Sequence, residues 1–264
     1  MYAHSDMITS RDNPTVKHFR KLLDSKKERT SERAFIIEGK RLVLDAFYSK
    51  AEIEKVFVTC TALGKFGNEL SDIISQCSVT VISDEIGDHI SDTENTQGVF
   101  AKCRFPENMD SMPKLKKGGK YVVLSKLRDP GNAGMIIRTA DALGLDGVIF
   151  SESCDVYNPK TVRATMGALF RVPVYHDIAV DDIFEKIEQS GLHSLAAVVD
   201  KDAEDIRKCD LSEGAAVFIG NEANGLDTDV KERCTQRITI KMSGNAESLN
   251  AAMASGILMW ELVR

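Results

Sequence analysis

Apolar and polar positions in the first part of the chain follow the spacings of short strands and amphipathic helices in turn. Asn13-Pro14 opens a segment with apolar residues at Val16, Phe19, Leu22 and Leu23 and a basic opposite face, which predicts a helix over 14–26. A second helix is predicted over 41–48. Apolar runs predict strands at 34–38, 55–59, 79–82 and 98–103. This alternation indicates a small α/β unit that ends near Phe105.

The second half has a more regular pattern. Strand-like runs occur at 121–127, 147–150, 172–175, 194–199, 215–219 and 238–242. Most are separated by helical patterns of about ten to fifteen residues, which is typical of βαβ units in a parallel sheet covered on both faces. The segment 106–120 lacks periodicity and has the Pro, Gly and Lys content of a linker. We therefore predict a first domain over 1–106, a linker over 107–119 and a parallel-sheet α/β domain over 120–264.

Composition narrows the classes of protein that fit. With 264 residues, 43% of them apolar, the chain can bury a core in each of two domains. It has no apolar run of signal-peptide or membrane-helix length, so we expect a cytoplasmic protein without membrane contact. The six cysteines are far apart, with no CxxC pair and no histidine at metal-ligand spacing nearby. Reduced thiols and no metal site are expected.

The net charge of −6 would oppose binding to a polyanion, but the charge is unevenly distributed. Between Ile8 and Arg41, basic residues outnumber acidic ones by ten to five. Such a run is often only the solvated face of a helix. Whether it instead contacts a polyanion depends on the motifs further along the chain.

The first polar cluster follows the strand predicted at 121–127. The turn Asp129–Gly134 leads into a helix with Ile136, Ile137, Ala140 and Leu143 on its core face. Arg138 is about two hundred degrees from Ile136 around this helix, so it should point away from the sheet toward a ligand, a second subunit or water. The plainer alternative makes Asn132 a turn former and Arg138 a surface charge.

The second and third clusters also follow predicted strands. Gly220–Gly225 places glycines around Glu222, which allows close backbone approach to a flat ligand with the carboxylate near the reacting centre. Ser248 and Asn250 begin the last helix, where they could act only as caps. The stripe that follows can be core or a dimer contact; it consists of Leu249, Ala252, Met253, Gly256, Ile257 and Trp260.

These clusters together resemble a known family. DPGNAGMIIRTADALG, FIGNEANGL and ITIKMSGNAESLNAAMASGI, in this order, are similar to the three motifs of the SpoU (TrmH-like) RNA 2'-O-ribose methyltransferases of the SPOUT superfamily. The first half resembles the substrate-binding domain that many members carry. That likeness rests on Ile8-Thr9-Ser10, Asn13-Pro14, Lys17, residues 35–39 and residues 96–99.

The resemblance implies a small N-terminal α/β RNA-binding domain and a C-terminal α/β domain with a deep trefoil knot. It also implies S-adenosylmethionine as cofactor and a homodimer whose active site draws on both subunits. Position by position, the cofactor contacts would be Gly220, Asn221, Ile240, Met242 and Leu249, and the catalytic residues Asn132, Arg138, Glu222, Ser248 and Asn250. The predicted RNA contacts are Arg11, Lys17, Arg20, Lys21, Arg29, Lys40 and Arg41.

In this family the residue matching Arg138 is proposed to help remove the ribose proton. A guanidinium resists deprotonation, so phosphate anchoring and oxyanion stabilisation are the favoured roles. Lys241 departs from the family pattern, where proline often precedes the methionine, so this loop could be less rigid.

Several functions stay open at this level. The expected activity is 2'-O-methylation of RNA, with ribosomal RNA of the large subunit favoured over transfer RNA, and antibiotic resistance through such methylation as a special case. A catalytically silent RNA-binding or ribosome-assembly protein is the alternative from another class. A nucleotide-dependent enzyme is disfavoured because the turn at Asp129–Gly134 lacks both GxxxxGK[ST] and GxGxxG.

Overall fold

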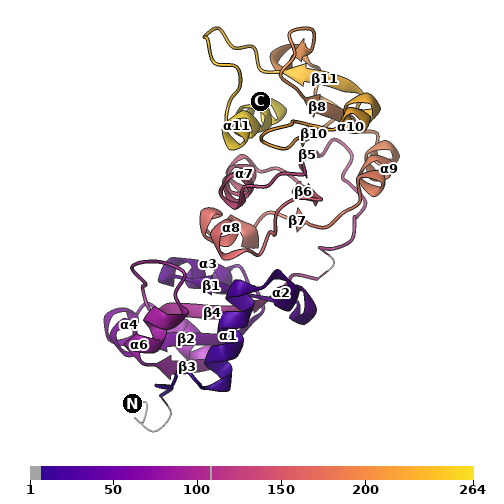
Figure 1. The fold of residues 1–264 in the computed structure, drawn as a ribbon. Coiled ribbons are helices and arrows are strands. Elements are labelled where there is room, and N and C mark those ends of the chain that lie inside the picture. Colours follow the sequence, from indigo (N-terminus) through magenta and orange to yellow (C-terminus); the bar gives the residue numbers. More distant parts are fainter. Residues whose placement is uncertain (1–6, 108) are drawn as a thin grey trace. The chain divides into compact units, whose positions relative to one another are not determined.

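The computed structural model describes residues 7–107 and 109–264, which form two compact units (Figure 1). Unit 1 contains the described residues up to Glu107 together with Tyr157–Phe170, and unit 2 contains the rest. The sequence predicted 157–170 within the second domain. In the structure Tyr157 instead stacks on Phe105, with ring centroids 3.8 Å apart, and packs against Phe35 at 4.7 Å. This long-range aromatic cluster leaves no periodic signal in the sequence.

Unit 1 is built on a four-stranded sheet of order β1-β4-β2-β3. β4 runs antiparallel to β1 and β2, and β2 runs parallel to β3. The strands are β1 (Ala34–Glu38), β2 (Ile53–Thr59), β3 (Val79–Ile82) and β4 (Val99–Arg104). The helices are α1 (Pro14–Asp24), α2 (Lys26–Glu32), α3 (Lys40–Tyr48), α4 (Cys60–Phe66), α5 (Ser71–Gln76), α6 (Asp84–Ile90) and α8 (Pro159–Ala164), with a 3-10 turn η2 (Ala168–Phe170).

The predicted apolar stripe of α1 is confirmed, since Val16, Phe19, Leu22 and Leu23 are all buried. Phe19 is central to the core of unit 1, where its ring meets Phe57 and Phe100 edge-on at centroid distances of 5.2 and 5.9 Å. Such edge-to-face pairs add to the stabilisation from burial alone.

The strands of this unit lie where the sequence predicted them, within one or two residues.

Unit 2 is built on a seven-stranded sheet of order β7-β6-β5-β10-β8-β11-β9, and all its strand pairs are parallel. The strands are β5 (Lys120–Ser125), β6 (Gly147–Ser151), β7 (Val174–Tyr175), β8 (His193–Ala197), β9 (Glu204–Asp205), β10 (Ala215–Ile219) and β11 (Gln236–Thr239). The helices are α7 (Pro130–Leu143), α9 (Val180–Ser190), α10 (Thr228–Arg233) and α11 (Ala251–Val263), with a 3-10 turn η3 (Ile206–Lys208).

Helices cover both faces of this sheet, as Figure 1 shows, with α7 and α11 on one face and α9 and α10 on the other. The predicted parallel-sheet α/β fold is thereby confirmed. The sequence missed β9, which has only two residues, and placed β11 two residues late. In the structure β11 pairs with β8 up to Ile238 and with β9 up to Thr239, where it ends. Among the described residues, no helix combines the length and hydrophobicity needed to cross a bilayer.

The strand order positions the loops that carry the polar clusters. β5 and β10 are direct neighbours, with Leu124 opposite Ile219, so the loops after these two strands leave the sheet side by side. β11 lies on the far side of β8. The chain after β11 nevertheless returns across the sheet end, because α11 packs on α7, β5 and β10.

Candidate active site

Glu222 joins the loop after β10 to the loop after β5. Its Oε2 accepts a hydrogen bond from the backbone N–H of Arg128 at 3.1 Å, and its Oε1 accepts from the N–H of Asp129 at 3.0 Å. The Asn132 amide donates a third bond to Oε1 at 3.1 Å. Both carboxylate oxygens are therefore occupied by the neighbouring loop. In this geometry Glu222 holds the two loops together, and the catalytic role that the resemblance implied for it stays a prediction.

The ionisation of Glu222 supports the same role. Partial burial acts to raise its pKa, but hydrogen bonds from the Asp129 and Arg128 N–H groups and from Asn132 outweigh that effect, and the net pKa is lowered. Hydrogen bonds to the charged form favour it. At neutral pH Glu222 is thus a carboxylate with little tendency to take up a proton.

Asn132 connects this pair of loops to the last helix. It is buried at the start of α7, where its backbone N–H donates to Asp129 Oδ1 at 2.7 Å. Its side-chain oxygen accepts a bond from Asn250 Nδ2 at 3.0 Å. The three sequence clusters, which are far apart along the chain, therefore form one continuous hydrogen-bonded chain from Glu222 through Asn132 to Asn250.

Asn250 caps the last helix and also bonds Asn132. Its Oδ1 accepts hydrogen bonds from the backbone N–H groups of Ala252 at 2.9 Å and Met253 at 3.3 Å, which caps α11. Its Nδ2 is left to donate to Asn132. Capping and site assembly use opposite ends of the same amide, so the start of α11 is fixed relative to the start of α7.

A cavity of about 1010 Å³ lies beside this hydrogen-bonded chain. It contains all five residues predicted to contact the cofactor, namely Gly220, Asn221, Ile240, Met242 and Leu249, and two predicted catalytic residues, Glu222 and Ser248. The remaining lining comes from β8, β10, α10, β11 and α11. The predicted residues thus converge on one hollow at the carboxyl ends of parallel strands, where open α/β sheets bind ligands.

Gly220 and Asn221 shape the cavity wall. A Cβ at Gly220 would lie 2.1 Å from the carbonyl carbon of Gly225, so only glycine fits there. The Asn221 side chain closes the turn by accepting from the Ala223 and Asn224 N–H groups, and it donates to the Lys126 carbonyl at 3.0 Å. The amide of Asn221 therefore holds the loops together, and the backbone of this turn is what faces the cavity.

Arg138 is not part of the cavity lining in this chain. It is exposed on α7, pointing away from the sheet as predicted, and lies six residues beyond Asn132, about 9 Å along the helix axis. Within the described residues, neither the Arg138 guanidinium nor the Ser248 hydroxyl has a protein hydrogen-bond partner. Both groups are therefore available to a ligand or a second subunit.

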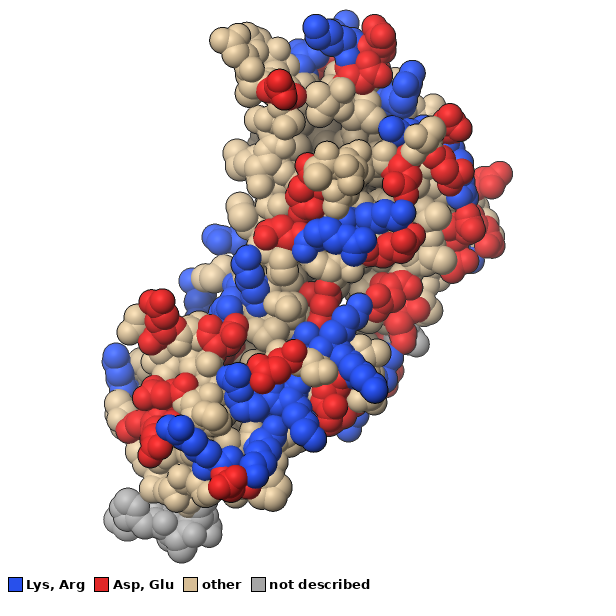
Figure 2. Space-filling view, viewed as in Figure 1, with Lys and Arg blue, Asp and Glu red and all other residues tan. Residues whose placement is uncertain are grey.

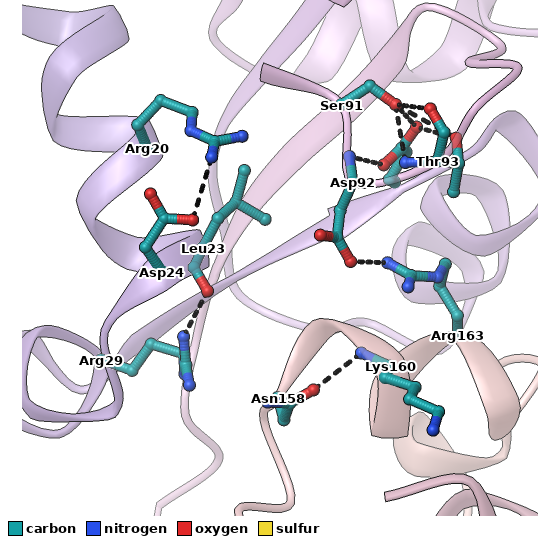
Figure 3. Close-up of polar contacts among 11 residues, drawn as sticks. Arg20, Leu23, Asp24, Arg29, Ser91, Asp92, Thr93, Asn158, Lys160 and Arg163 are labelled. Atoms are coloured by element: carbon teal, nitrogen blue, oxygen red, sulfur yellow. Dashed lines mark hydrogen bonds and ion pairs between the residues drawn. The ribbon is translucent and has the colours of Figure 1, made fainter. Parts of the chain in front are cut away.

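Arg29 is the one predicted RNA contact that the structure contradicts. Only 3% of it is exposed, and its Nη1 donates to the Leu22 and Leu23 carbonyls at 2.6 and 2.8 Å (Figure 3). These carbonyls are at the end of α1, which leaves them without helical partners. Arg29 therefore stabilises the join between α1 and α2, a role that the charge pattern alone does not distinguish from a surface role.

The other predicted cations are at the surface of unit 1, but most have acidic partners. Lys17 pairs with Asp12 at 2.7 Å, Arg20 with Asp24 at 3.1 Å (Figure 3), and Arg11 and Lys40 also pair with carboxylates. Figure 2 shows acidic side chains interleaved with basic ones on the face in view. Within the described chain, Lys21 and Arg41 have no such partner. The ten-to-five excess of basic over acidic residues between Ile8 and Arg41 therefore gives a surface of mixed charge and no continuous basic patch on the face in view.

Two further features of the site were missed from the sequence. Asp129 caps α7, a role that its position before Pro130 could have indicated. Arg128 is exposed beside Glu222, although only its backbone N–H makes the contact. Within the described residues, no group of three His, Cys, Asp or Glu side chains is arranged to hold a metal ion.

Comparisons with known proteins cover both halves of the chain. The sequence profile of the SpoU rRNA Methylase family matches residues 119–260, and that of the MRM3-like substrate binding domain matches residues 13–101. The chain is 32% identical to the 23S rRNA (guanosine(2553)-2'-O)-methyltransferase RlmP of Bacillus subtilis, over 97% of this chain and 98% of that protein. It is 28% identical to the 23S rRNA (uridine(2479)-2'-O)-methyltransferase of Streptomyces viridochromogenes, over 97% and 91%.

A solved structure agrees with these sequence matches. The crystal structure of AdoMet-bound rRNA methyltransferase from Sinorhizobium meliloti aligns with a TM-score of 0.84 at 30% identity. The alignment covers 97% of this chain and 96% of that one. The similarity therefore extends over both units.

Proposed function

Because the chain belongs to the SpoU rRNA methylase family, we propose that it transfers a methyl group from S-adenosylmethionine to a ribose 2'-hydroxyl of RNA, with large-subunit ribosomal RNA as substrate. The observation that carries the proposal is the hydrogen-bonded chain Glu222–Asn132–Asn250 beside a cavity of about 1010 Å³. The names of both similar enzymes, which act on 23S rRNA, support the choice of substrate. We extend the proposal to the cytoplasm as the place of action.

The cavity fits the cofactor. Gly220, which no other residue could replace without a clash, exposes backbone to the hollow, and apolar side chains of Ile238 and Leu258 line it further in. Gly220, Ile240 and Leu249 would hold the cofactor largely through backbone groups, with Met242 at the rim. When bound, S-adenosylmethionine supplies a sulfonium methyl group that a ribose oxygen can attack.

The residues of this chain then have a limited task. No covalent nucleophile is needed, because the reaction depends on bringing the hydroxyl and the methyl group together in a water-poor pocket. Glu222, Asn132 and Asn250 fix the three loops that form the pocket. Arg138 would anchor a phosphate of the RNA and stabilise the developing oxyanion, since a guanidinium carries its charge at all relevant pH values.

A homodimer would bring Arg138 into a site. Met135 and Arg138 are three positions apart on α7, so they share one face of the helix. Beside them α11 presents Met253, 58% exposed, and Trp260, 57% exposed. Contiguous apolar side chains of this size at the surface are typical of an interface. The predicted stripe on α11 is therefore a dimer contact in this proposal, and Arg138 of one subunit would serve the cavity of its partner.

The trefoil knot is also part of the proposal. Its support is the return of the chain after β11, on the far side of β8, to place α11 on α7, β5 and β10. The segment 240–250 makes this return as a loop that can be followed in Figure 1, and Ile240, Met242, Ser248 and Leu249 of this segment line the cavity. Knotted connections are rare, so such a crossing is a specific feature of a fold.

The activity can be tested directly. The protein is incubated with labelled S-adenosylmethionine and either ribosomal RNA or transfer RNA, and the 2'-O-methylated riboses are mapped by their resistance to alkaline hydrolysis. We expect one methylated position in large-subunit ribosomal RNA. Transfer to transfer RNA alone would favour the alternative substrate, and no transfer to any RNA would favour a non-catalytic RNA-binding protein.

A further inference from the structure

Unit 1 contains a second cavity, of about 290 Å³, that is separate from the cofactor site. Its walls come from three segments that are distant in sequence: the start of α3, the loop 93–97 and the segment 163–166. Of the seven residues predicted to contact RNA, Arg41 is the one that lines this cavity. The charge pattern along the chain does not reveal it, because the cavity exists only once these segments meet.

The loop that forms one wall is fixed in place before any ligand binds. The Glu38 carboxylate accepts hydrogen bonds from the hydroxyls of Ser91 and Thr93, both at 2.7 Å, and from the Asp92 N–H at 3.0 Å. Figure 3 shows the Ser91, Asp92 and Thr93 contacts. At the other end of the loop, Gln97 Oε1 accepts from the Lys40 N–H at 2.8 Å. A wall held at both ends loses little entropy when a ligand binds.

The segment 163–166 forms the opposite wall and is held as firmly. Arg163 Nη1 bonds Asp92 Oδ2 at 2.7 Å, which ties this segment to the loop (Figure 3). After it, a Cβ at Gly167 would lie only 2.4 Å from the Asp45 carboxylate, so the chain runs close against α3. Between these two anchors Met166 has φ +49°, which few non-glycine residues adopt. This strain keeps the Met166 side chain, 42% exposed, at the cavity.

The chemistry of the lining indicates its ligand. The buried Leu42 and the thioether of Met166 provide apolar surface, and sulfur packs well against aromatic rings. Asn95 and Gln97 are exposed at the rim, and with its Oε1 already bonded to Lys40, Gln97 has its NH₂ group free to donate. The Arg41 guanidinium is exposed and has no partner among the described residues. The lining also contains two carboxylates, Asp45 and Glu38, and both oxygens of Glu38 already accept hydrogen bonds from residues 91–93. Apolar surface, amide groups and an exposed guanidinium in one small hollow suit a flat heterocycle that is attached to a phosphate.

We propose that this cavity, the base pocket, binds one unstacked nucleobase of the RNA substrate, with Arg41 contacting an adjoining phosphate. The proposal rests on the proposed function, because it assumes that RNA is the substrate. Sequence-specific recognition of RNA mostly uses bases that are splayed out of single-stranded loops and read along their edges. The base pocket would therefore help to select the RNA, while the chemistry takes place in unit 2.

The test compares variants in the full-length protein by steady-state kinetics on ribosomal RNA and by RNA affinity. Met166→Gly removes the side chain without backbone cost, because glycine adopts positive φ readily. We expect Met166→Gly and Arg41→Ala each to raise KM and Kd for RNA about tenfold, with kcat and cofactor affinity unchanged. Met166→Leu retains the bulk and should stay within about twofold. Thermal melting checks that each variant is folded.

Lys27→Ala is the matched control for Arg41→Ala, because Lys27 is also an exposed cation of unit 1, has no acidic partner among the described residues and is not one of the predicted RNA contacts. It should change KM for RNA less than twofold. The proposal is overturned if Lys27→Ala has the larger effect, or if Met166→Gly is folded and binds RNA as well as the wild type. It is also overturned if the variants lower kcat alone.

Photo-crosslinking separates this proposal from the proposed function. RNA containing 4-thiouridine is irradiated with the protein, and the crosslinked peptides are identified by mass spectrometry. We expect crosslinks to peptides containing Arg41 or Met166. If these form while no methyl transfer occurs, the base pocket stands and the proposed activity fails; methyl transfer with crosslinks only elsewhere overturns the base pocket.

Discussion

The cavity in unit 2 and the base pocket in unit 1 are built in different ways. The large cavity of unit 2 lies beside three loops that bond to one another through Glu222, Asn132 and Asn250, and its wall includes Gly220, where only glycine fits. The lining of the base pocket of unit 1 includes the long side chains of Arg41 and Met166. A reaction common to a family can use fixed backbone and a few fixed residues. Recognition of one RNA among many is better served by side chains, which can vary without disturbing the fold.

Arg138 is the largest exception to this contrast between the two cavities, because we propose that its side chain is essential to the chemistry in unit 2. Arg138→Ala should lower the rate of methyl transfer about 10²- to 10³-fold, because it removes a charge that stabilises the transition state. Cofactor affinity, measured by calorimetry, should not change, since Arg138 does not line the cavity of its own chain. Arg128→Ala is the control, as another exposed arginine near the site. Loss of cofactor binding in Arg138→Ala would refute this division of roles.

Gly220 tests whether the backbone forms the cofactor site. In Gly220→Ala the new methyl group would lie 2.1 Å from the Gly225 carbonyl carbon, so the turn must move. We expect cofactor affinity to fall at least about 100-fold, by roughly 3 kcal/mol, as measured by calorimetry. Gly244→Ala, in an exposed loop with nothing within 4 Å, should bind normally. Normal binding by Gly220→Ala would show that the turn is more adaptable than proposed.

Trp260 tests whether the apolar face of α7 and α11 is an interface. Trp260→Glu places a charge on a face that we propose to be buried in a homodimer, and it should weaken self-association by about 2 kcal/mol, or roughly 30-fold. Sedimentation at several concentrations measures this, and Trp260→Phe should retain the dimer. Methyl transfer should fall at the concentrations where Trp260→Glu is monomeric. A wild-type protein that is monomeric and fully active would contradict the shared active site.

Glu222 has the smallest expected effect, and it tests whether the loops are preassembled. Hydrogen bonds from the loop after β5 lower its pKa in the folded protein below the ordinary glutamate value of about 4.5. Its contribution to stability is therefore present above about pH 4.5 and is lost as the pH falls through the lower folded pKa. Glu222→Gln should cost about 1 kcal/mol of unfolding free energy at pH 7. Denaturant titrations between pH 7 and pH 3 should show less acid sensitivity in Glu222→Gln; an unchanged pH profile would contradict the role of this carboxylate.

The sequence predicted the site better than its surroundings. The family resemblance carried by the three motifs is confirmed by the profile match to residues 119–260. Strands such as β1 and β10 were placed correctly, because each is a short apolar run bounded by turn residues. The bond between Asn132 and Asn250 could not be predicted from spacing, since residues so far apart meet only through the strand order.

Errors arose where the same residue type can serve opposite purposes. Arg29 is one of ten basic residues between Ile8 and Arg41, yet its guanidinium is buried against the end of α1. For the stripe with Met253 and Trp260 the sequence left both core and interface open, so no prediction failed there, and the structure exposes both side chains. Tyr157 packs with unit 1 although the sequence around it predicts nothing unusual. Burial depends on neighbours from elsewhere in the chain, and a local pattern does not contain them.

The sequence by itself determined which elements form, and it determined the three polar clusters at strand ends, because periodicity and turn chemistry are local properties of the chain. The tertiary structure decided which of those residues work together. Placing β10 beside β5 directed Glu222 to the loop of Asn132, and returning α11 to the same place made Asn250 its partner. Bringing 163–166 against α3 created the base pocket. These contacts join residues that are far apart in the sequence, so they depend on the packing of the whole chain and not on local pattern.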